Sequence, residues 1–136
     1  MKQELRAIPI WGLASARHGS IFVDRTGTAG MLRDMMRQAQ AAVARGRPVV
    51  IFPEATRVGV GETPPLAAGF AGLYKILKLP VVAVALDSGS VWPKNFIKYP
   101  GTVHMKLAAP IPPGLPRADV EARVHAAINA LQGQSR

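Results

Sequence analysis

The alternation of short apolar runs with longer helical patterns is the feature that most limits how this chain can fold. Runs rich in β-formers occupy residues 20–23, 48–52, 81–86 and 102–107. Patterns in which apolar residues recur every three or four positions occupy residues 28–45, 67–79 and 117–131. Parallel strands need a long crossover, which a helix can fill. The order therefore predicts an α/β fold with a largely parallel sheet flanked by helices.

The apolar runs also predict how far each element is covered. The runs at 48–52 and 81–86 are almost continuously apolar, which is typical of strands covered on both faces. Gly46 and Pro48 are stop signals for the helix before them, and the prolines of residues 111–116 favour an extended connector. Without repeats or a long linker, we expect a single domain over residues 1–132 and a frayed tail over 133–136.

Charge and cysteine content exclude several function classes. The chain has 136 residues, no cysteine and a net charge of +9. Disulfide scaffolds, thiolate metal sites and cysteine nucleophiles are excluded, and a reducing compartment fits. The charge suits lipid headgroups, phosphorylated metabolites and nucleic acid alike. Because the basic residues are scattered, we expect no nucleic-acid partner. The longest apolar runs are too short to cross a bilayer.

The chemistry-bearing residues follow the apolar run at 48–52. Glu54, Thr56 and Arg57 come directly after it, and open α/β sheets bind ligands at the carboxyl ends of their strands. Arg57 can present a bidentate fork to a phosphate, Thr56 can donate its hydroxyl, and Glu54 can hold the arginine or a substrate hydroxyl. A strand-end ion pair with a capping threonine explains the same residues. Local chemistry leaves both interpretations open.

Four blocks of sequence resemble one family. Residues 52–57, F-P-E-A-T-R, resemble the F-P-E-G-T-R block of the glycerolipid acyltransferases, specifically the lysophosphatidic acid acyltransferases. Residues 19–25, G-S-I-F-V-D-R, resemble the family's G-x-x-F-[IV]-D-R block. Residues 2–5, K-Q-E-L, and 79–85, L-P-V-V-A-V-A, resemble its K-x-E-L and L-P-[VI]-[VI]-P-V-A blocks. The blocks keep the family's order and cover most of residues 1–107.

The resemblance implies a reaction and its partners. It implies transfer of a fatty acyl group from a thioester of coenzyme A or acyl carrier protein to the hydroxyl of lysophosphatidate. The product is phosphatidate, a phospholipid precursor, and no other cofactor and no metal is implied. We therefore expect a peripheral protein on the cytoplasmic face of an anionic membrane.

The resemblance also implies roles for particular residues. By it, Lys2, Arg25 and Arg57 bind the acceptor phosphate. The residues implied to shape the pocket are Gly19, Glu54, Ala55 and Thr56. Two of the cations also have plainer interpretations, since Arg25 can form a turn ion pair with Asp24 and Lys2 can be merely solvated.

The family's catalytic block is absent from these residues. In the family, H-x-x-x-x-D supplies a histidine general base and an aspartate that orients it. The residues five positions after His18, His104 and His125 are Val23, Ala109 and Ala130. We interpret the three histidines as structural and assign no catalytic residue. One explanation, which we favour, is a missing N-terminal portion. The other is an inactive remnant that at most binds anionic lipid or phosphate.

Ala55 is a second departure, because the family block has glycine there. If the turn requires a positive φ or a close approach of phosphate to the backbone, the added Cβ costs about 1 kcal/mol. The departure predicts weaker acceptor binding.

Overall fold

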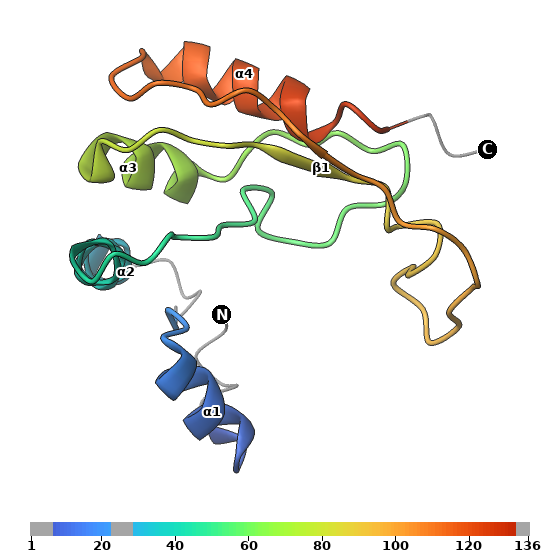
Figure 1. Ribbon diagram of the computed structural model, residues 1–136, viewed down its shortest axis with the longest axis horizontal. Coiled ribbons are helices and arrows are strands. Elements are labelled where there is room, and N and C mark those ends of the chain that lie inside the picture. The colour runs from blue at the N-terminus through green and yellow to red at the C-terminus, as the bar shows by residue number, and fades with distance from the viewer. Residues whose placement is uncertain (1–6, 23–28, 133–136) are drawn as a thin grey trace. The chain divides into compact units, whose positions relative to one another are not determined.

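The computed structural model describes residues 7–22 and 29–132 (Figure 1). The chain divides into two compact units, Met1–Val50 and Ile51–Arg136, which are described separately below. The tail over 133–136 lies outside the described residues, and the single domain over residues 1–132 stays a prediction.

The described residues of the first unit contain two helices, each followed within two residues by a glycine. Helix α1 is Trp11–His18, and α2 is Ala29–Ala44, where the sequence predicts a helix at 28–45. Gly19 and Gly46 follow the helices with φ of 83° and 70°. After α1, the Gly19 and Ser20 amides donate to the Ala16 and Ser15 carbonyls at 3.0 and 2.9 Å. This is the Schellman arrangement, which favours glycine because it requires a left-handed residue.

The second unit is built around a small apolar core. Helix α3 is Ala68–Leu77 and α4 is Arg117–Ile128, so both predicted helices are confirmed. The two helices lie side by side in Figure 1 and contact each other. Their inward faces and the chain beside them bury the five core residues, which are Phe70, Tyr74, Ile111, Val120 and Val124.

The proline-rich connector is fixed by one tyrosine. The Tyr74 hydroxyl donates to the Pro112 carbonyl at 2.6 Å and accepts from the Leu115 amide at 3.0 Å. Ile111, at the start of the connector, pairs with Val81 in an isolated antiparallel bridge. The connector is extended at this bridge, as the sequence predicts, but it turns at residues 113–114, where Gly114 has a φ of 91°. The two bonds of Tyr74 tie it to α3.

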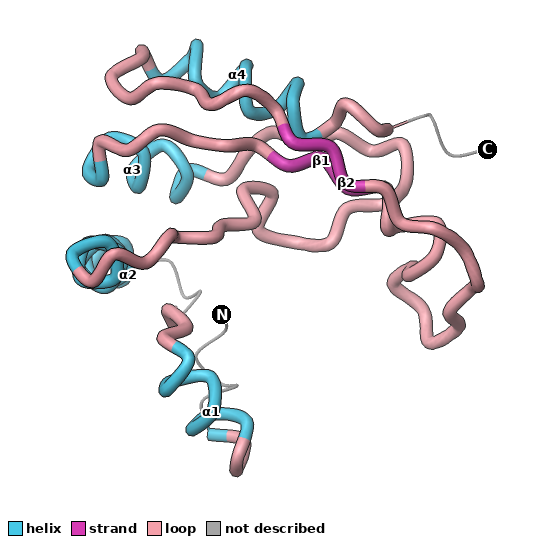
Figure 2. The backbone as a smooth tube through the Cα atoms, in the orientation of Figure 1, coloured by secondary structure: helices cyan, strands magenta, loops and turns pink. Residues whose placement is uncertain are grey.

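The described sheet is antiparallel, which corrects the predicted pairing. Strand β1, Val84–Leu86, pairs with β2, Met105–Leu107, and Val84 lies opposite Leu107 (Figure 2). The residues between the strands contain no helix; Pro93, Pro100 and Gly101 interrupt them. The chain therefore returns beside β1 in the opposite direction. Among the described residues, no parallel pair is present.

Two of the predicted strands are not found. Residues 20–22 and 48–52 have no strand assignment, and Val50 and Phe52 are 81% and 76% exposed. Position 23 lies outside the described residues. A strand needs a neighbour for its backbone groups, and the sheet of the described residues consists of β1 and β2 without these segments. The run at 81–86, which contains β1, is covered on one face only: Ala83 and Ala85 are buried, whereas Val82 and Leu86 are exposed. The prediction that both runs are covered on two faces is wrong here.

Candidate functional site

The candidate site in the second unit is a loop over residues 54–66, between Phe52-Pro53 and α3. A turn closes its start, with the Ala55 amide donating to the Phe52 carbonyl at 3.0 Å. The Ala67 amide donates to the Pro53 carbonyl at 2.8 Å and so joins the two ends of the loop. Ala55 has a φ of 58°, a left-handed conformation that costs a residue with a Cβ about 1–2 kcal/mol. The turn therefore requires the positive φ considered from sequence.

Helix α4 and the chain after it hold the far side of this loop. The His125 ring nitrogen Nε2 lies 3.1 Å from the Pro64 carbonyl oxygen and 3.2 Å from that of Thr63. The Gln132 side-chain oxygen accepts from the Gly61 amide at 3.0 Å. The His125 ring thereby contacts the backbone of the loop, and its interpretation as structural stays a prediction. His125 and Gln132 support the loop. Neither residue lies in one of the four sequence blocks, so the sequence did not predict these contacts.

The polar residues of the site are open to solvent. Thr56 and Arg57 are exposed and Glu54 is half-buried. No side chain of residues 51–132 forms a salt bridge or a side-chain hydrogen bond with any of the three. Glu54 and Arg57 therefore form no ion pair within residues 51–132, and Thr56 caps no helix there, so the plainer interpretation of these residues does not apply. The Arg57 guanidinium keeps its full set of donors for an external anion.

Gly19 lies in the first unit, beside a hollow of about 260 Å³. Arg47 donates from its guanidinium to the His18 carbonyl, and a Cβ on Gly19 would overlap that guanidinium. Arg45 and Arg47 both line the hollow with Gly19. The sequence analysis did not predict a role for these two arginines. Their positions on either side of Gly46, the stop signal of the helix, could have pointed to them.

Lys2 and Arg25, the other two predicted phosphate ligands, lie outside the described residues. So does Asp24, the alternative partner of Arg25. Within the described part of the chain, no cluster of three or more acidic, histidine or cysteine residues is placed to hold a metal ion. None of the described helices is long and apolar enough to cross a membrane.

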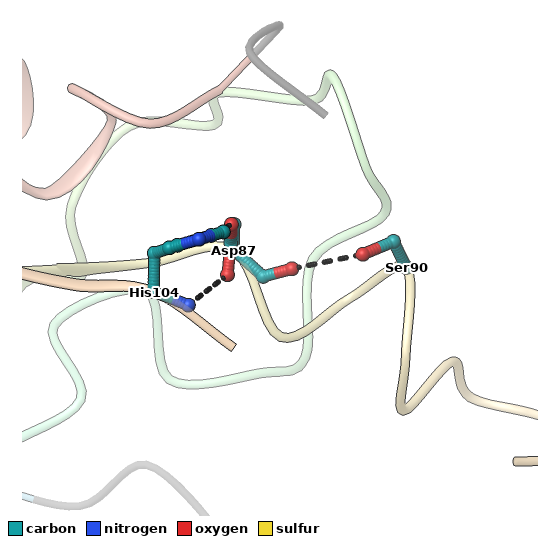
Figure 3. A network of polar contacts seen from close by, with 3 residues as sticks. All are labelled: Asp87, Ser90 and His104. Carbon is teal, nitrogen blue, oxygen red and sulfur yellow. Dashed lines mark hydrogen bonds and ion pairs between the residues drawn. The ribbon is translucent and has the colours of Figure 1, made fainter. Parts of the chain in front are cut away.

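One acid–histidine pair occurs away from this loop. The Asp87 carboxylate accepts from the His104 amide at 2.7 Å, and its other oxygen lies 2.6 Å from His104 Nδ1 (Figure 3). An ionised carboxylate only accepts hydrogen bonds, so Nδ1 carries the proton. The bonds from the His104 ring and amide hold the pKa of Asp87 below its ordinary value. This pair joins the end of β1 to the residue before β2.

Comparison with known proteins decides the family. A model of the family described as "Acyltransferase" matches residues 1–87, well over half of the chain. The chain belongs to this family. A 1-acyl-sn-glycerol-3-phosphate acyltransferase of Pseudomonas aeruginosa is 35% identical over 108 residues, covering 79% of the chain and 42% of that protein. The similarity confirms the glycerolipid branch of the acyltransferases that the sequence blocks resemble.

Two further acyltransferases are similar over smaller shares of their own length. The protein of the same name from Cocos nucifera is 27% identical, covering 81% of the chain and 36% of that protein. A 1-acyl-sn-glycerol-3-phosphate acyltransferase epsilon of Mus musculus is 33% identical, covering 65% and 27%. The chain thus spans less than half the length of these curated relatives. Comparison with solved structures found no match.

Proposed function

We propose that this chain supplies acceptor-binding residues for transfer of a fatty acyl group from an acyl thioester to lysophosphatidate. The exposed and unpaired guanidinium of Arg57, on a loop whose ends are joined, carries the proposal. The planar guanidinium fork of an arginine matches the geometry of a phosphate monoester. Thr56 and Glu54 flank it in sequence, and the names of the similar proteins specify an acylated glycerol phosphate.

The other predicted residues fit the same proposal. Lys2 and Arg25 add positive charge for the acceptor phosphate, and Gly19 and Ala55 shape the pocket. The thioester is carried on coenzyme A or acyl carrier protein, and both carriers are anionic, as is a membrane surface rich in acidic phospholipids. The chain's charge of +9 is complementary to all of them. We therefore propose that the protein acts at the cytoplasmic face of the membrane.

Binding of a short-chain lysophosphatidate, measured by calorimetry, tests the role of Arg57 without requiring turnover. Losing a charge-assisted bidentate contact costs about 1.5–3 kcal/mol, so Arg57→Ala should raise the Kd about 10- to 100-fold. Arg57→Lys keeps the charge without the fork and should fall between the two. Arg123→Ala removes an exposed arginine of α4 and should bind normally. An Arg57→Ala chain that binds like the unsubstituted one refutes the assignment.

The second candidate is a chain that binds anionic lipid or phosphate without acyl transfer. The absence of H-x-x-x-x-D from the 136 residues favours it, since no histidine–aspartate pair at that spacing can serve as base. Thiol release from an acyl thioester in the presence of lysophosphatidate separates the two functions. The intact mass of the protein isolated from its own cells is the companion measurement. A mass well above 14.5 kDa with an H-x-x-x-x-D peptide supports the enzyme.

A further inference from the structure

The excursion between β1 and β2 exposes large apolar side chains to an unusual degree. We call residues 88–103 the aromatic loop. It extends beyond the strands, away from α3 and α4, in yellow to orange in Figure 1. Its most exposed large side chains, with their exposed fractions, are Phe96 at 103%, Trp92 at 62%, Ile97 at 59% and Tyr99 at 50%. These four residues lie within residues 92–99, and large apolar side chains exposed together mark interaction surfaces on proteins.

Contacts within the loop hold its backbone in place. The Tyr99 amide donates to the Val91 carbonyl at 3.0 Å, which closes the loop above its base. The Lys98 ammonium donates to the carbonyls of Asn95 at 2.6 Å and Pro93 at 3.2 Å. The same ammonium lies 5.0 Å from the centre of the Trp92 ring. The exposed side chains are thus presented by an ordered turn and are not buried against it.

The charged residues within the aromatic loop are all basic. No aspartate or glutamate occurs between Asp87 and Asp119, whereas Lys94, Lys98 and Lys106 lie within that interval. Two copies of the loop would bring like charges together, which disfavours self-association. An anionic partner with an apolar interior fits both the lysines and the rings.

We propose that the aromatic loop docks on the surface of an anionic lipid bilayer. Phe96 and Ile97 enter the boundary between headgroups and acyl chains, where buried apolar area drives binding. Trp92 and Tyr99 lie at headgroup level, the depth that amphipathic rings prefer. Lys94 faces the lipid phosphates. The inference rests on the proposed function in that a lipid acceptor brings the chain to a bilayer.

Fluorescence of Trp92 tests the depth of the loop directly. The chain has two tryptophans, so the exposed Trp11 is replaced by phenylalanine to leave Trp92 as the single reporter. Vesicles of phosphatidylcholine and phosphatidylglycerol with brominated acyl chains should quench Trp92 and shift its emission to the blue. A chain that sediments with these vesicles while Trp92 stays unquenched overturns the proposal.

Sedimentation with the same vesicles, unbrominated, tests the individual side chains. Phe96→Ser should weaken partitioning about tenfold, because an exposed aromatic ring no longer becomes buried. Lys94→Gln should weaken it about fivefold. Leu107→Ser is the matched control, since Leu107 is 64% exposed and lies on β2 outside the loop. It should leave partitioning unchanged.

Two results would overturn the assignment of the loop. One is Phe96→Ser partitioning like the unsubstituted chain. The other is a Phe96→Ser chain that loses self-association in sedimentation velocity while vesicle binding is unchanged, which would make the loop a contact between copies. The vesicles contain no acceptor or thioester. Failure of acyl transfer therefore leaves this test unaffected, and failure of docking leaves calorimetric binding of lysophosphatidate unaffected.

Discussion

At the scale of single residues, Ala55 shows how one methyl group sets the cost of a turn. Its φ of 58° places an alanine where the family's block has glycine. The left-handed conformation costs alanine about 1–2 kcal/mol. A glycine at this position, in turn, lowers the free energy of unfolding by about 0.4–1 kcal/mol, because it gives the unfolded chain more conformational freedom. The strain of alanine at this φ exceeds the entropic cost of glycine.

Ala55→Gly should therefore raise the free energy of unfolding by about 0.5–1 kcal/mol, measured by urea denaturation. If the Cβ also narrows the phosphate site, the same variant should lower the Kd for lysophosphatidate. Ala68→Gly, in the first turn of α3, is the control and should destabilise, because glycine is unfavourable in a helix. Unchanged stability and affinity in Ala55→Gly would show that the strain at this turn is relieved elsewhere.

Asp87 predicts a pH dependence with a definite sign. Its pKa is lowered from the ordinary 3.8 by the hydrogen bonds from His104, so the folded state favours the carboxylate. The stabilisation is fully present above the unfolded pKa near 3.8 and is lost as pH falls through the lower folded pKa. Asp87→Asn should lower the Tm at pH 7, and the difference should shrink below about pH 4.

Ser90→Ala is the control for that titration. The Ser90 hydroxyl donates to the Asp87 carbonyl at 3.2 Å (Figure 3), a neutral contact. Its effect on the Tm should not change with pH. An Asp87→Asn difference that is equally constant from pH 7 to pH 2.5 would contradict a titrating carboxylate at this position.

At the scale of elements, three of the four described helices and the positions of β1 and β2 were predictable, whereas two further strands did not form and the pairing of the sheet was not predicted. Apolar spacing alone placed α2, α3 and α4, because a helix satisfies its backbone within one segment and needs only one covered face. Val49-Val50-Ile51-Phe52 has the same apolar character as a buried strand, yet Val50 and Phe52 are exposed. A strand depends on a distant neighbour, which spacing in the sequence does not specify.

The candidate site shows the same division. The F-P-E-A-T-R block placed Glu54, Thr56 and Arg57 on one loop from sequence alone. The supports of that loop, His125 and Gln132, come from 60 or more residues away and carry no local motif. α1 was also missed, since Ile8-Pro9-Ile10-Trp11-Gly12 offers no helix-start signal of the usual capping type.

The Tyr74 hydroxyl predicts how strongly α3 and the proline-rich connector depend on each other. Tyr74→Phe leaves the ring packed beside Phe70, at a centroid distance of 6.3 Å, but removes two hydrogen bonds. The Pro112 carbonyl and the Leu115 amide lose their partner. The free energy of unfolding should fall by about 1–3 kcal/mol.

Tyr99→Phe provides the comparison, because Tyr99 is 50% exposed and its hydroxyl forms no hydrogen bond with the described residues. It should change stability by less than about 0.5 kcal/mol. Equal effects of the two substitutions in the same urea titration would mean that the Tyr74 hydroxyl contributes nothing beyond its ring.

At the scale of the whole molecule, charge dominates the expected behaviour. The 17 basic and 8 acidic residues give +9, and two of the described ion pairs, Arg37–Asp34 and Arg117–Glu121, lie within single helices. In the part of the chain that the structure describes, Arg37 and Arg117 are the only lysine or arginine residues in ion pairs, so most of the positive charge there is open to external anions. Long-range attraction to lipid phosphates should govern the first encounter with a bilayer.

Salt provides the test of that attraction. The screening length falls from about 10 Å at 0.1 M salt to about 3 Å at 1 M, so vesicle binding should weaken steeply over this range. Binding to uncharged phosphatidylcholine vesicles should be weak and nearly independent of salt. Binding that ignores both salt and lipid charge would assign the affinity to apolar contacts alone.

The contacts that close the aromatic loop lie almost entirely within the loop and its flanking residues, which makes it suitable for grafting onto another protein. Its base is fixed by the Asp87–His104 pair and its middle by the bond from Tyr99 to Val91. All of these partners belong to the loop or to the residues next to it. The rest of the fold supplies an antiparallel strand pair with the β1–β2 register and the Val60 side chain, which lies close to Gly89. We therefore expect residues 84–107 to keep their shape when grafted onto another hairpin of that register.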